Sequence, residues 1–262
     1  MIRRLLRLFG IGKSGAVAVE AASLSDRGLV RRDNQDNLLV GRESGVYCVA
    51  DGMGGGEGGA KASEIVCAAV AAATASRAGM PGRIGQVADA IRDANSEIRE
   101  FAKKAGYRQM ATTVTSFILD PGGERSAVLG YVGDSRLYRL RGGTLEQLSH
   151  DHTIAGELGR RASLRDSADT GQARSGRLSH VLTRAVGIEP EVQVEWRKID
   201  LAPGDYYLLC TDGVYDMVPG SGIRRAISTG GKCEEIVAKL RDMIVARGAI
   251  DNFTMILLRI KG

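Results

Sequence analysis

Aspartates stand next to apolar runs at four places in this sequence. Apolar runs end at Asp51, Asp134 and Asp212, and Asp251 opens another. If buried strands gathered these carboxylates at one edge, their charges would repel one another strongly unless cations lay among them. Mg²⁺ and Mn²⁺ prefer such oxygen ligands. An Asp-Gly pair at a strand end is also a common turn, so the spacing leaves a metal site and a set of turns both open.

A glycine-rich run over residues 51–59 directly precedes a predicted helix. Glycines let the backbone approach a ligand closely, and the start of a helix favours anions. The run is not a nucleotide-binding P-loop, because no Gly-Lys-Ser/Thr follows it. That tripeptide does occur at residues 12–14, but Arg7 occupies the position of the first glycine. The sequence also lacks the Gly-x-Ser-x-Gly pattern that places a nucleophilic serine.

The elements that must position the aspartates are short strands on either side of long helices. Apolar residues at helical spacing predict helices over residues 60–78, 84–104 and 234–246. This order does not alternate strand with helix, which disfavours a doubly wound parallel sheet. We therefore predict an α+β fold, an antiparallel β-sandwich flanked by α-helices on both outer faces. Alternation and β-branched residues predict its strands over residues 16–25, 37–40, 46–50, 112–119, 126–132, 136–141, 144–148, 192–199, 206–211 and 253–260.

Two further segments lie outside these regular elements. Residues 150–180 are polar and weakly periodic, and we predict a mobile flap there, near the candidate active-site edge. Residues 1–15 mix apolar residues with arginines, and we interpret them as an N-terminal extension, either a frayed end or a short amphipathic surface anchor. Residues 16–262 are predicted to form a single domain. All the histidines lie in or beside the flap: His150, His152 and His180.

Composition argues against several classes of protein. The 36 basic and 31 acidic residues leave a net charge of +5, and no basic run is interleaved with aromatic residues, so we expect no nucleic-acid partner. The 4 cysteines form no Cys-x-x-Cys pair, which predicts reduced thiols suited to a reducing cytosol. The longest stretch of small apolar residues, 67–75, is far too short to span a bilayer. We therefore predict a cytoplasmic monomer without a transmembrane segment.

Short motifs in a fixed order give a more specific signal than the aspartates alone. Residues 25–31, followed by residues 34–36, resemble the opening motif of the bacterial type 2C (PPM) metal-dependent serine/threonine protein phosphatases. Residues 51–55 look like the central metal motif of that family. The resemblance covers roughly residues 16–260 and implies a four-layer α-β-β-α sandwich. Later stretches are similar to the remaining motifs, in the family's order: Thr112-Thr113 and residues 133–136, 182–187, 210–213 and 251–254.

The resemblance implies that the aspartates are metal ligands. Asp51 would bridge two ions, and the carbonyl of Gly52 would ligate one of them. Asp212 and Asp251 would hold the catalytic ion, and Asp134 would help to hold a third, weaker one. The family thus implies Mn²⁺ or Mg²⁺ as the cofactor, with two or three ions bound.

The same resemblance implies a reaction. Asp36 would order metal-bound water, and Arg31 would grip the substrate phosphate, a bidentate task suited to a guanidinium. Water activated between two ions would attack phosphorus directly, without a covalent phosphoenzyme. The implied activity is hydrolysis of phosphoserine and phosphothreonine in target proteins, opposing a bacterial serine/threonine kinase that would itself be among the phosphorylated partners. The implied catalytic residues are Arg31, Asp36, Asp51, Asp212 and Asp251.

Two alternative functions stay open at this point. The chain could be a pseudophosphatase, a binding module that keeps the fold with weak or no catalysis. The intact carboxylates and Arg31 argue against that alternative. The chain could also hydrolyse small phosphorylated metabolites, although a long flap favours a protein substrate.

Two residues depart from the family's pattern. Gln35 stands where many members carry a glutamate near the second metal, and an amide brings no charge, so that ion would bind more weakly. Met53 stands where eukaryotic members carry a histidine proposed as the general acid. Because methionine has no proton to donate, a metal-bound water or His152 would have to protonate the leaving oxygen.

Overall fold

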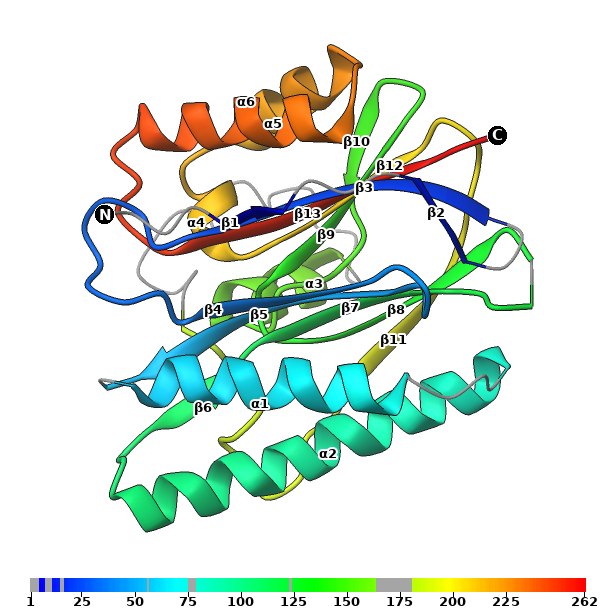
Figure 1. The fold of residues 1–262 in the computed structure, drawn as a ribbon. Coiled ribbons are helices and arrows are strands. Elements are labelled where there is room, and N and C mark those ends of the chain that lie inside the picture. Colours follow the sequence, from blue (N-terminus) through cyan, green and yellow to red (C-terminus); the bar gives the residue numbers. More distant parts are fainter. Residues whose placement is uncertain are drawn as a thin grey trace.

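The computed structural model describes residues 5–7, 11–14, 17–55, 57–74, 79–122, 124–163 and 181–262. Two antiparallel β-sheets lie face to face, and helices cover the outer face of each sheet (Figure 1). The predicted α+β sandwich with helices on both outer faces is therefore confirmed. Central strands of such a sandwich are covered on both sides, which explains why they read as continuous apolar runs in the sequence.

The two sheets differ in strand order. The first runs β1-β3-β13-β12-β9-β10, with β2 also paired to β3, and the second runs β11-β8-β7-β5-β4, with β6 paired to β5. The strands of the first sheet are β1 (Leu5–Arg7), β2 (Ile11–Ser14), β3 (Val17–Asp26), β9 (Arg136–Arg141), β10 (Thr144–Gln147), β12 (Tyr206–Cys210) and β13 (Phe253–Ile260). The strands of the second sheet are β4 (Asp36–Gly41), β5 (Val46–Gly54), β6 (Met110–Thr112), β7 (Val114–Leu119), β8 (Ser126–Val132) and β11 (Glu195–Asp200).

Helices form the two outer layers of the molecule. The long pair α1 (Gly58–Ala73) and α2 (Met80–Ala105) covers the second sheet, and α5 (Gly220–Ser228) and α6 (Cys233–Val245) cover the first (Figure 1). Two further helices, α3 (Ile154–Ser163) and α4 (Asp212–Tyr215), lie in connections between strands. In the part of the chain that the structure describes, no helix is both long and apolar enough to cross a membrane.

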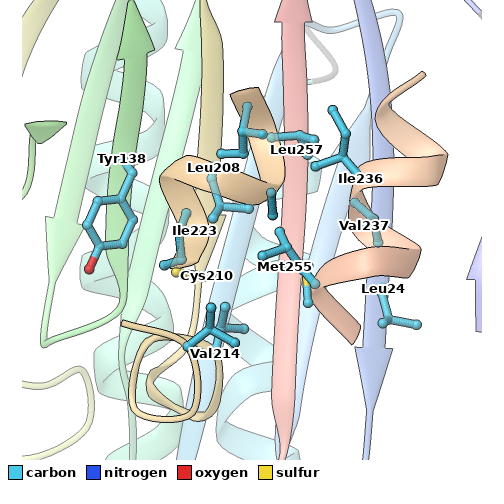
Figure 2. Close-up of a cluster of buried hydrophobic side chains, with 14 of the residues drawn as sticks. Leu24, Tyr138, Leu208, Cys210, Val214, Ile223, Ile236, Val237, Met255 and Leu257 are labelled. Carbon is cyan, nitrogen blue, oxygen red and sulfur yellow. The ribbon is translucent and has the colours of Figure 1, made fainter. Parts of the chain in front are cut away.

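Apolar side chains fill the spaces between the layers. Between the sheets, the rings of Phe117 and Tyr207 stack with their centroids 4.9 Å apart. On the outer face of the first sheet, Leu208 and Leu257 pack in the same buried cluster as Ile236 of α6 (Figure 2). A third cluster joins α1 and α2 to the second sheet. Close packing on both faces holds the strands rigidly, so side chains at the strand ends are fixed in position.

The N-terminal extension adds to the first sheet in its described part. β1 pairs with β3 so that Leu6 lies opposite Leu24, and β2 pairs with the same strand so that Gly12 lies opposite Val19. The two short strands therefore lie one after the other along one edge of β3. The sequence pattern did not predict either strand, because three or four residues are too few to show a period.

The predicted flap over residues 150–180 is only partly described. Residues 164–180, which include His180, lie outside the described residues. The preceding part is more ordered than its polar composition suggested, because residues 154–163 form α3 and His152 is buried. The two stems of the segment also pair with each other, since the backbone N–H of Ile154 donates to the carbonyl of Val181 at 3.0 Å.

Candidate active site

Four of the predicted aspartates come together at one end of the sandwich. In the antiparallel pair β4–β5, Asp36 lies directly opposite Asp51. Asp212 begins α4 immediately after β12, and its side chain is within hydrogen-bonding reach of Asp51. Asp134 follows β8 and is close enough for its charge to act on Asp51. The structure thus brings together carboxylates from segments that lie far apart in the sequence.

The clustered carboxylates disfavour one another's charged forms. Loss of hydration, followed by the charges of Asp36, Asp212 and Asp134, raises the pKa of Asp51 well above its ordinary value. Burial and the neighbouring acids raise the pKa of Asp36 to about 7 and that of Asp134 to about 8. At neutral pH such a group is fully ionised only if a positive charge compensates it.

Asp36 also carries an unsatisfied oxygen. Its side chain is nearly buried, and its Oδ2 accepts a hydrogen bond from the hydroxyl of Thr211 at 2.9 Å. Its Oδ1 is buried and has no hydrogen-bond partner within the described residues. A buried acceptor without a partner costs free energy, so the position suits a bound water.

The ligand chemistry of this cluster fits Mn²⁺ or Mg²⁺. All the converging side-chain donors are carboxylate oxygens, which hard divalent cations prefer to nitrogen or sulfur. Within the described ranges, however, no three acidic, histidine or cysteine side chains come close enough together to hold a metal ion by themselves. Backbone carbonyls and waters would have to complete a ligand set.

The backbone around Asp51 is fixed by neighbouring hydroxyl groups. The hydroxyl of Thr113 accepts a hydrogen bond from the N–H of Asp51 at 2.9 Å and bonds to the hydroxyl of Ser135 at 2.7 Å. The hydroxyl of Thr112 donates to the carbonyl of Asp51 at 2.9 Å. These hydroxyls link the Asp51 strand to the residue that follows Asp134. The sequence motifs included these residues but did not predict that they fix the backbone of Asp51. The available signal was a pair of polar residues inside an otherwise apolar strand.

The glycine-rich loop folds tightly against the start of α1. A Cβ added at Gly52 would lie 2.0 Å from the carbonyl oxygen of Gly59, so no other residue fits at position 52. The side-chain amide of Gln35 donates to the carbonyl of Gly54 at 3.3 Å. A Cβ added at Gly59 would also lie 2.7 Å from the Gln35 side-chain oxygen. Gln35 therefore contacts this loop.

Arg31 and Asp251 lie together at the open side of the cluster. The guanidinium donates to a carboxylate oxygen of Asp251 at 2.7 Å, with the two side chains 56% and 33% exposed. This hydrogen bond raises the pKa of Arg31. The structure therefore places the arginine predicted to bind phosphate beside one of the predicted metal ligands, where a solute can reach it.

Asn252 holds this part of the site in shape, a role that the sequence did not predict. Its side-chain oxygen accepts from the backbone N–H of Gln35 at 2.9 Å, and its amide donates to the carbonyls of Arg27 and Asp33 at 2.9 and 2.8 Å. One buried amide thus ties the loop that carries Arg31 to the start of β13. Its position next to Asp251 in the sequence was the only signal.

A second set of missed residues supports Asp134. The hydroxyl of Tyr215 donates to the Asp134 backbone carbonyl at 3.1 Å. The guanidinium of Arg136 lies 3.5 Å from the centre of the Tyr215 ring and pairs with Asp151 at 2.6 Å. An aromatic ring between a cation and the aspartate loop fixes that loop through cation–π attraction and hydrogen bonding.

His152 is not the surface residue that the flap prediction suggested. It is 1% exposed, and its Nδ1 accepts a hydrogen bond from the backbone N–H of Gly133 at 3.1 Å. Its Nε2 lies 3.3 Å from Glu195, and its ring stacks on Tyr131. Burial lowers its pKa. Both ring nitrogens are engaged, Nδ1 by the turn before Asp134 and Nε2 by Glu195, so the residue is placed for a structural role.

An open groove of about 690 Å³ lies next to His152, along α3. Its acids and bases are mostly paired with one another, as in the Arg184–Glu157 and Arg160–Glu195 ion pairs at 2.7 and 3.2 Å. None of the predicted site residues is among its lining residues: Ile154, Glu157, Leu158, Arg160, Thr183, Arg184, Gln193 and Glu195.

Comparison with known proteins agrees with this geometry. Residues 26–240 match the protein phosphatase 2C family. Protein phosphatase PhpP of Streptococcus pneumoniae is 28% identical over 247 residues, which cover 92% of this chain and 97% of PhpP. Among solved structures, PppA, a regulatory component of T6SS in Pseudomonas aeruginosa, superposes with a TM-score of 0.81 at 31% identity, covering 92% of this chain and 97% of PppA.

A third similar protein was solved with metal. The catalytic domain of the serine/threonine protein phosphatase PstP, in complex with 2 manganese ions, superposes with a TM-score of 0.79 at 30% identity, covering 94% of this chain and 99% of that domain. The chain belongs to the protein phosphatase 2C family. The resemblance seen in the sequence and the predicted enzyme class, a metal-dependent protein phosphatase, are thereby confirmed.

Proposed function

We propose that this chain hydrolyses phosphoserine and phosphothreonine in other proteins, with Mn²⁺ or Mg²⁺ held by the carboxylate cluster. The observation that carries the proposal is the convergence of Asp36, Asp51, Asp134 and Asp212 at one end of the sandwich, which raises the pKa of the first three. Such a cluster is unfavourable for the folded protein by itself, and divalent cations are the ligands that would relieve it.

The proposed ligands are those implied by the family motifs. Asp51, the carbonyl of Gly52, Asp212 and Asp251 would hold two ions, and Asp134 would help to hold a third. Bound ions would compensate the carboxylate charges and lower the pKa of the water that attacks phosphorus. Asp36 would orient that water, because it has a buried oxygen free of hydrogen bonds to described residues.

Arg31 is the proposed phosphate-binding residue. Its exposed guanidinium already binds one carboxylate, and a phosphate presents the same pattern of paired oxygens. Substrate would therefore take the place of Asp251 as its partner. Replacement by alanine should raise KM more than it lowers kcat, since the contact is made before the reaction begins.

The departing serine oxygen needs a proton, and His152 was the one side chain that the sequence suggested as its source. Met53 has none to give. The ring nitrogens of His152 are both engaged, and burial lowers its pKa. We therefore propose that solvent within the site protonates the leaving group.

We also propose that the substrates include a serine/threonine kinase and that the enzyme is a cytoplasmic monomer. The support for a kinase partner is chemical: a phosphatase acts repeatedly only where another enzyme restores the phosphoester. Copurification of a phosphorylated kinase with a catalytically inactive variant would test the partner directly.

Metal dependence and substrate class can be tested together. The protein is stripped with a chelator and assayed on a phosphothreonine peptide, free phosphoserine and an aryl phosphate while Mn²⁺ or Mg²⁺ is titrated back. We expect no activity without metal, and a kcat/KM for the peptide at least about tenfold above that for free phosphoserine. Full activity after exhaustive chelation would refute the metal proposal. A preference for free phosphoserine would instead favour a metabolite phosphatase.

A further inference from the structure

We infer that the surface beside Arg31 recognises an aliphatic side chain close to the phosphorylated residue of the substrate, accompanied by an acidic side chain. This inference rests on the proposed phosphatase function and adds a sequence preference to it. The surface, called here the aliphatic patch, consists of Leu29, Val30 and Ile250, which are 58%, 66% and 55% exposed.

The aliphatic patch is continuous with the candidate active site. Its two loops lie side by side, because the N–H of Leu29 donates to the carbonyl of Ala249 at 2.8 Å. Val30 directly precedes Arg31, and Ile250 directly precedes Asp251, the partner of Arg31 at 2.7 Å. A protein segment that delivers a phosphate to Arg31 is therefore within reach of these three side chains.

Single exposed aliphatic residues are common and need no explanation. Here, however, three of the seven large hydrophobic residues that are exposed in the described part of the chain gather on two adjoining loops: the full set is Leu29, Val30, Phe101, Leu158, Val181, Ile188 and Ile250. Apolar side chains grouped within a polar rim are typical of a surface that binds a partner.

The loops of the patch are held firmly in this exposed position. Gly28 has a φ of 75°, and a Cβ there would lie 2.2 Å from the carbonyl oxygen of Asp251, so the two backbones are in direct contact. Asn252 ties both ends of the first loop to β13. Ala249 adopts a φ of 38°, a left-handed conformation that non-glycine residues rarely adopt. A surface held in advance binds with a smaller loss of conformational entropy.

Basic residues flank the patch. Arg27 and Arg32 are both exposed, and Arg27 donates to the carbonyl of Arg32 at 3.0 Å. Among the described residues, neither forms an ion pair with an acid: Asp33 is exposed beside Arg32, and Asp26, beside Arg27, lies 3.9 Å from Arg241. The two guanidinium groups favour a carboxylate on the partner.

The ligand that we assign to the aliphatic patch is the stretch of substrate next to the phosphorylated residue. An extended peptide advances about 3.3 Å per residue, so a side chain within about three positions reaches the patch while the phosphate reaches Arg31. Burying one leucine there would improve binding by roughly tenfold, and an adjacent glutamate would find Arg27 or Arg32.

The test uses matched phosphothreonine peptides at saturating Mn²⁺. Each set carries serine, leucine alone, glutamate alone or the leucine–glutamate pair at positions scanned across the three residues on either side. We expect the leucine–glutamate peptide to be preferred by about tenfold in kcat/KM at one side of the phosphoresidue. Equal rates at every position would overturn the inference. Activity on no phosphopeptide at all would instead count against the proposed function.

Variants then assign the preference to the patch. In the double variant Leu29→Ser/Ile250→Ser the preference for leucine should disappear, and in Arg27→Glu/Arg32→Glu the preference for glutamate should disappear or reverse. Hydrolysis of an aryl phosphate, which is too short to reach the patch, normalises each rate for damage to the site. The matched controls are Ile188→Ser, an exposed aliphatic residue in the segment that contacts α2, and Arg224→Glu on the exposed side of α5.

Each alternative outcome counts against the inference. If the patch variants keep the wild-type preference, or if the controls lose it equally, the patch does not select substrate. If wild-type protein self-associates and Leu29→Ser/Ile250→Ser abolishes this association without changing peptide preference, the patch is instead a contact between two copies of the chain. Sedimentation of both proteins at assay concentration distinguishes these cases.

Discussion

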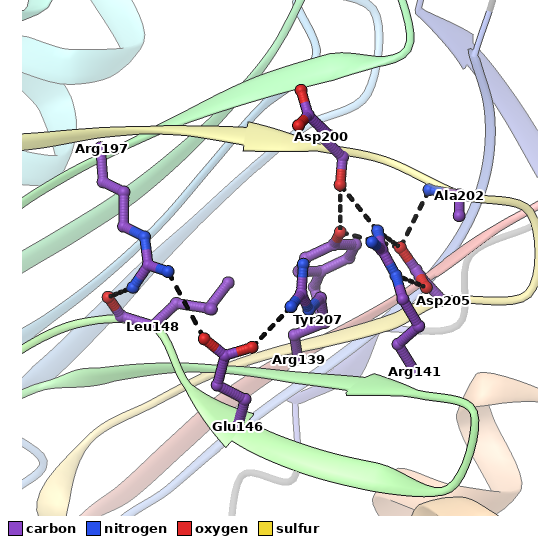
Figure 3. Close-up of polar contacts among 9 residues, drawn as sticks. All are labelled: Arg139, Arg141, Glu146, Leu148, Arg197, Asp200, Ala202, Asp205 and Tyr207. Carbon is purple, nitrogen blue, oxygen red and sulfur yellow. Dashed lines mark hydrogen bonds and ion pairs between the residues drawn. The ribbon is translucent and has the colours of Figure 1, made fainter.

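An aspartate stands near each end of strand β12, and the two aspartates have opposite electrostatic surroundings. Asp205, just before the strand, is 2% exposed and receives two hydrogen bonds from Arg141, at 2.8 and 2.6 Å, together with bonds from Tyr207 and the N–H of Ala202 (Figure 3). Asp212, just after the strand, lies among other carboxylates and is within hydrogen-bonding reach of Asp51. One strand therefore ends in a fully paired acid on one side and a crowded one on the other.

The surroundings extend this difference. Around Asp205 the charges alternate, since Glu146 binds Arg139 at 2.5 Å and Arg197 at 3.4 Å (Figure 3). Burial alone would raise the pKa of Asp205. The hydrogen bonds from Arg141, Ala202 and Tyr207 outweigh burial and lower this pKa. Burial and like charge raise the pKa of the clustered acids at the other end. The paired end stabilises the fold by itself, whereas the crowded end should become favourable only when a cation binds.

Replacing Asp212 by asparagine should have the largest effect on activity. It should not destabilise the metal-free protein. We expect kcat/KM on a phosphothreonine peptide to fall at least about a hundredfold, because a proposed metal ligand would lose its charge. The metal-free protein should unfold at an equal or higher urea concentration, because one like charge beside Asp51 is gone. Marked destabilisation without metal would show that Asp212 has a stabilising role in the fold.

The corresponding change at the other end, Asp205→Asn, should do the reverse. The free energy of unfolding should fall by about 1–3 kcal/mol, because Arg141 and the Ala202 N–H lose a charged acceptor. Normalised activity should stay within about twofold, since no site residue is touched. Urea unfolding measures the first effect, with Asp242→Asn, an exposed residue of α6, as the control. Equal stability of the two variants would remove the contrast between the ends.

The two ends should also respond to pH with opposite signs. The folded metal-free protein holds protons on Asp36 and Asp134, whose pKa values rise to about 7 and about 8, and unfolding releases them once pH exceeds the ordinary value of 3.8. Stability should therefore fall as pH rises from about 4 to about 8, and saturating Mn²⁺ should reduce this fall. Asp205 contributes stability above its ordinary pKa of 3.8 that is lost as pH falls through its lower folded value.

Unfolding curves of metal-free protein across this pH range measure that slope. In Asp36→Asn and Asp134→Asn the fall toward high pH should be smaller, whereas in Asp205→Asn it should be unchanged. A metal-free protein whose stability is level between about pH 4 and pH 8 would contradict the raised pKa values.

His152→Ala should cost about 1–3 kcal/mol of stability, because the buried N–H of Gly133 loses its acceptor. Phosphopeptide and aryl phosphate hydrolysis should slow by similar, small factors, since the turn before Asp134 loosens for both substrates. His150→Ala, an exposed histidine two residues earlier, is the matched control. A loss of about a hundredfold on the phosphopeptide alone would make His152 the general acid after all.

The smallest expected change in stability is that of Arg31→Ala. Its ion pair with Asp251 is exposed, with side chains 56% and 33% accessible, so the free energy of unfolding should change by less than about 1 kcal/mol. Arg141→Ala should cost more, because it leaves the buried carboxylate of Asp205 without its main partner. Similar losses of stability in Arg31→Ala and Arg141→Ala would mean that Arg31 has a structural role.

Periodic elements of this protein could be predicted closely. The ranges predicted for β8, β9 and β13 agree with the structure, because long alternating or apolar runs carry a clear period. The helix α5 was missed, since two glycines in its first turn lower its helix propensity and its stability comes from packing on the first sheet. The buried histidine of the predicted flap was missed for a related reason: its partners, Gly133 and Glu195, are distant in sequence.

The sequence by itself determined which residue types stand at which strand ends, and hence that oxygen ligands were available for a hard cation. Only the tertiary structure decided which of them meet. The β4–β5 register sets Asp36 opposite Asp51, and the pairing of Arg31 with Asp251 spans 220 positions of chain. The reason is physical: burial and charge depend on what surrounds a group in space, and local sequence fixes neither for residues brought together by packing.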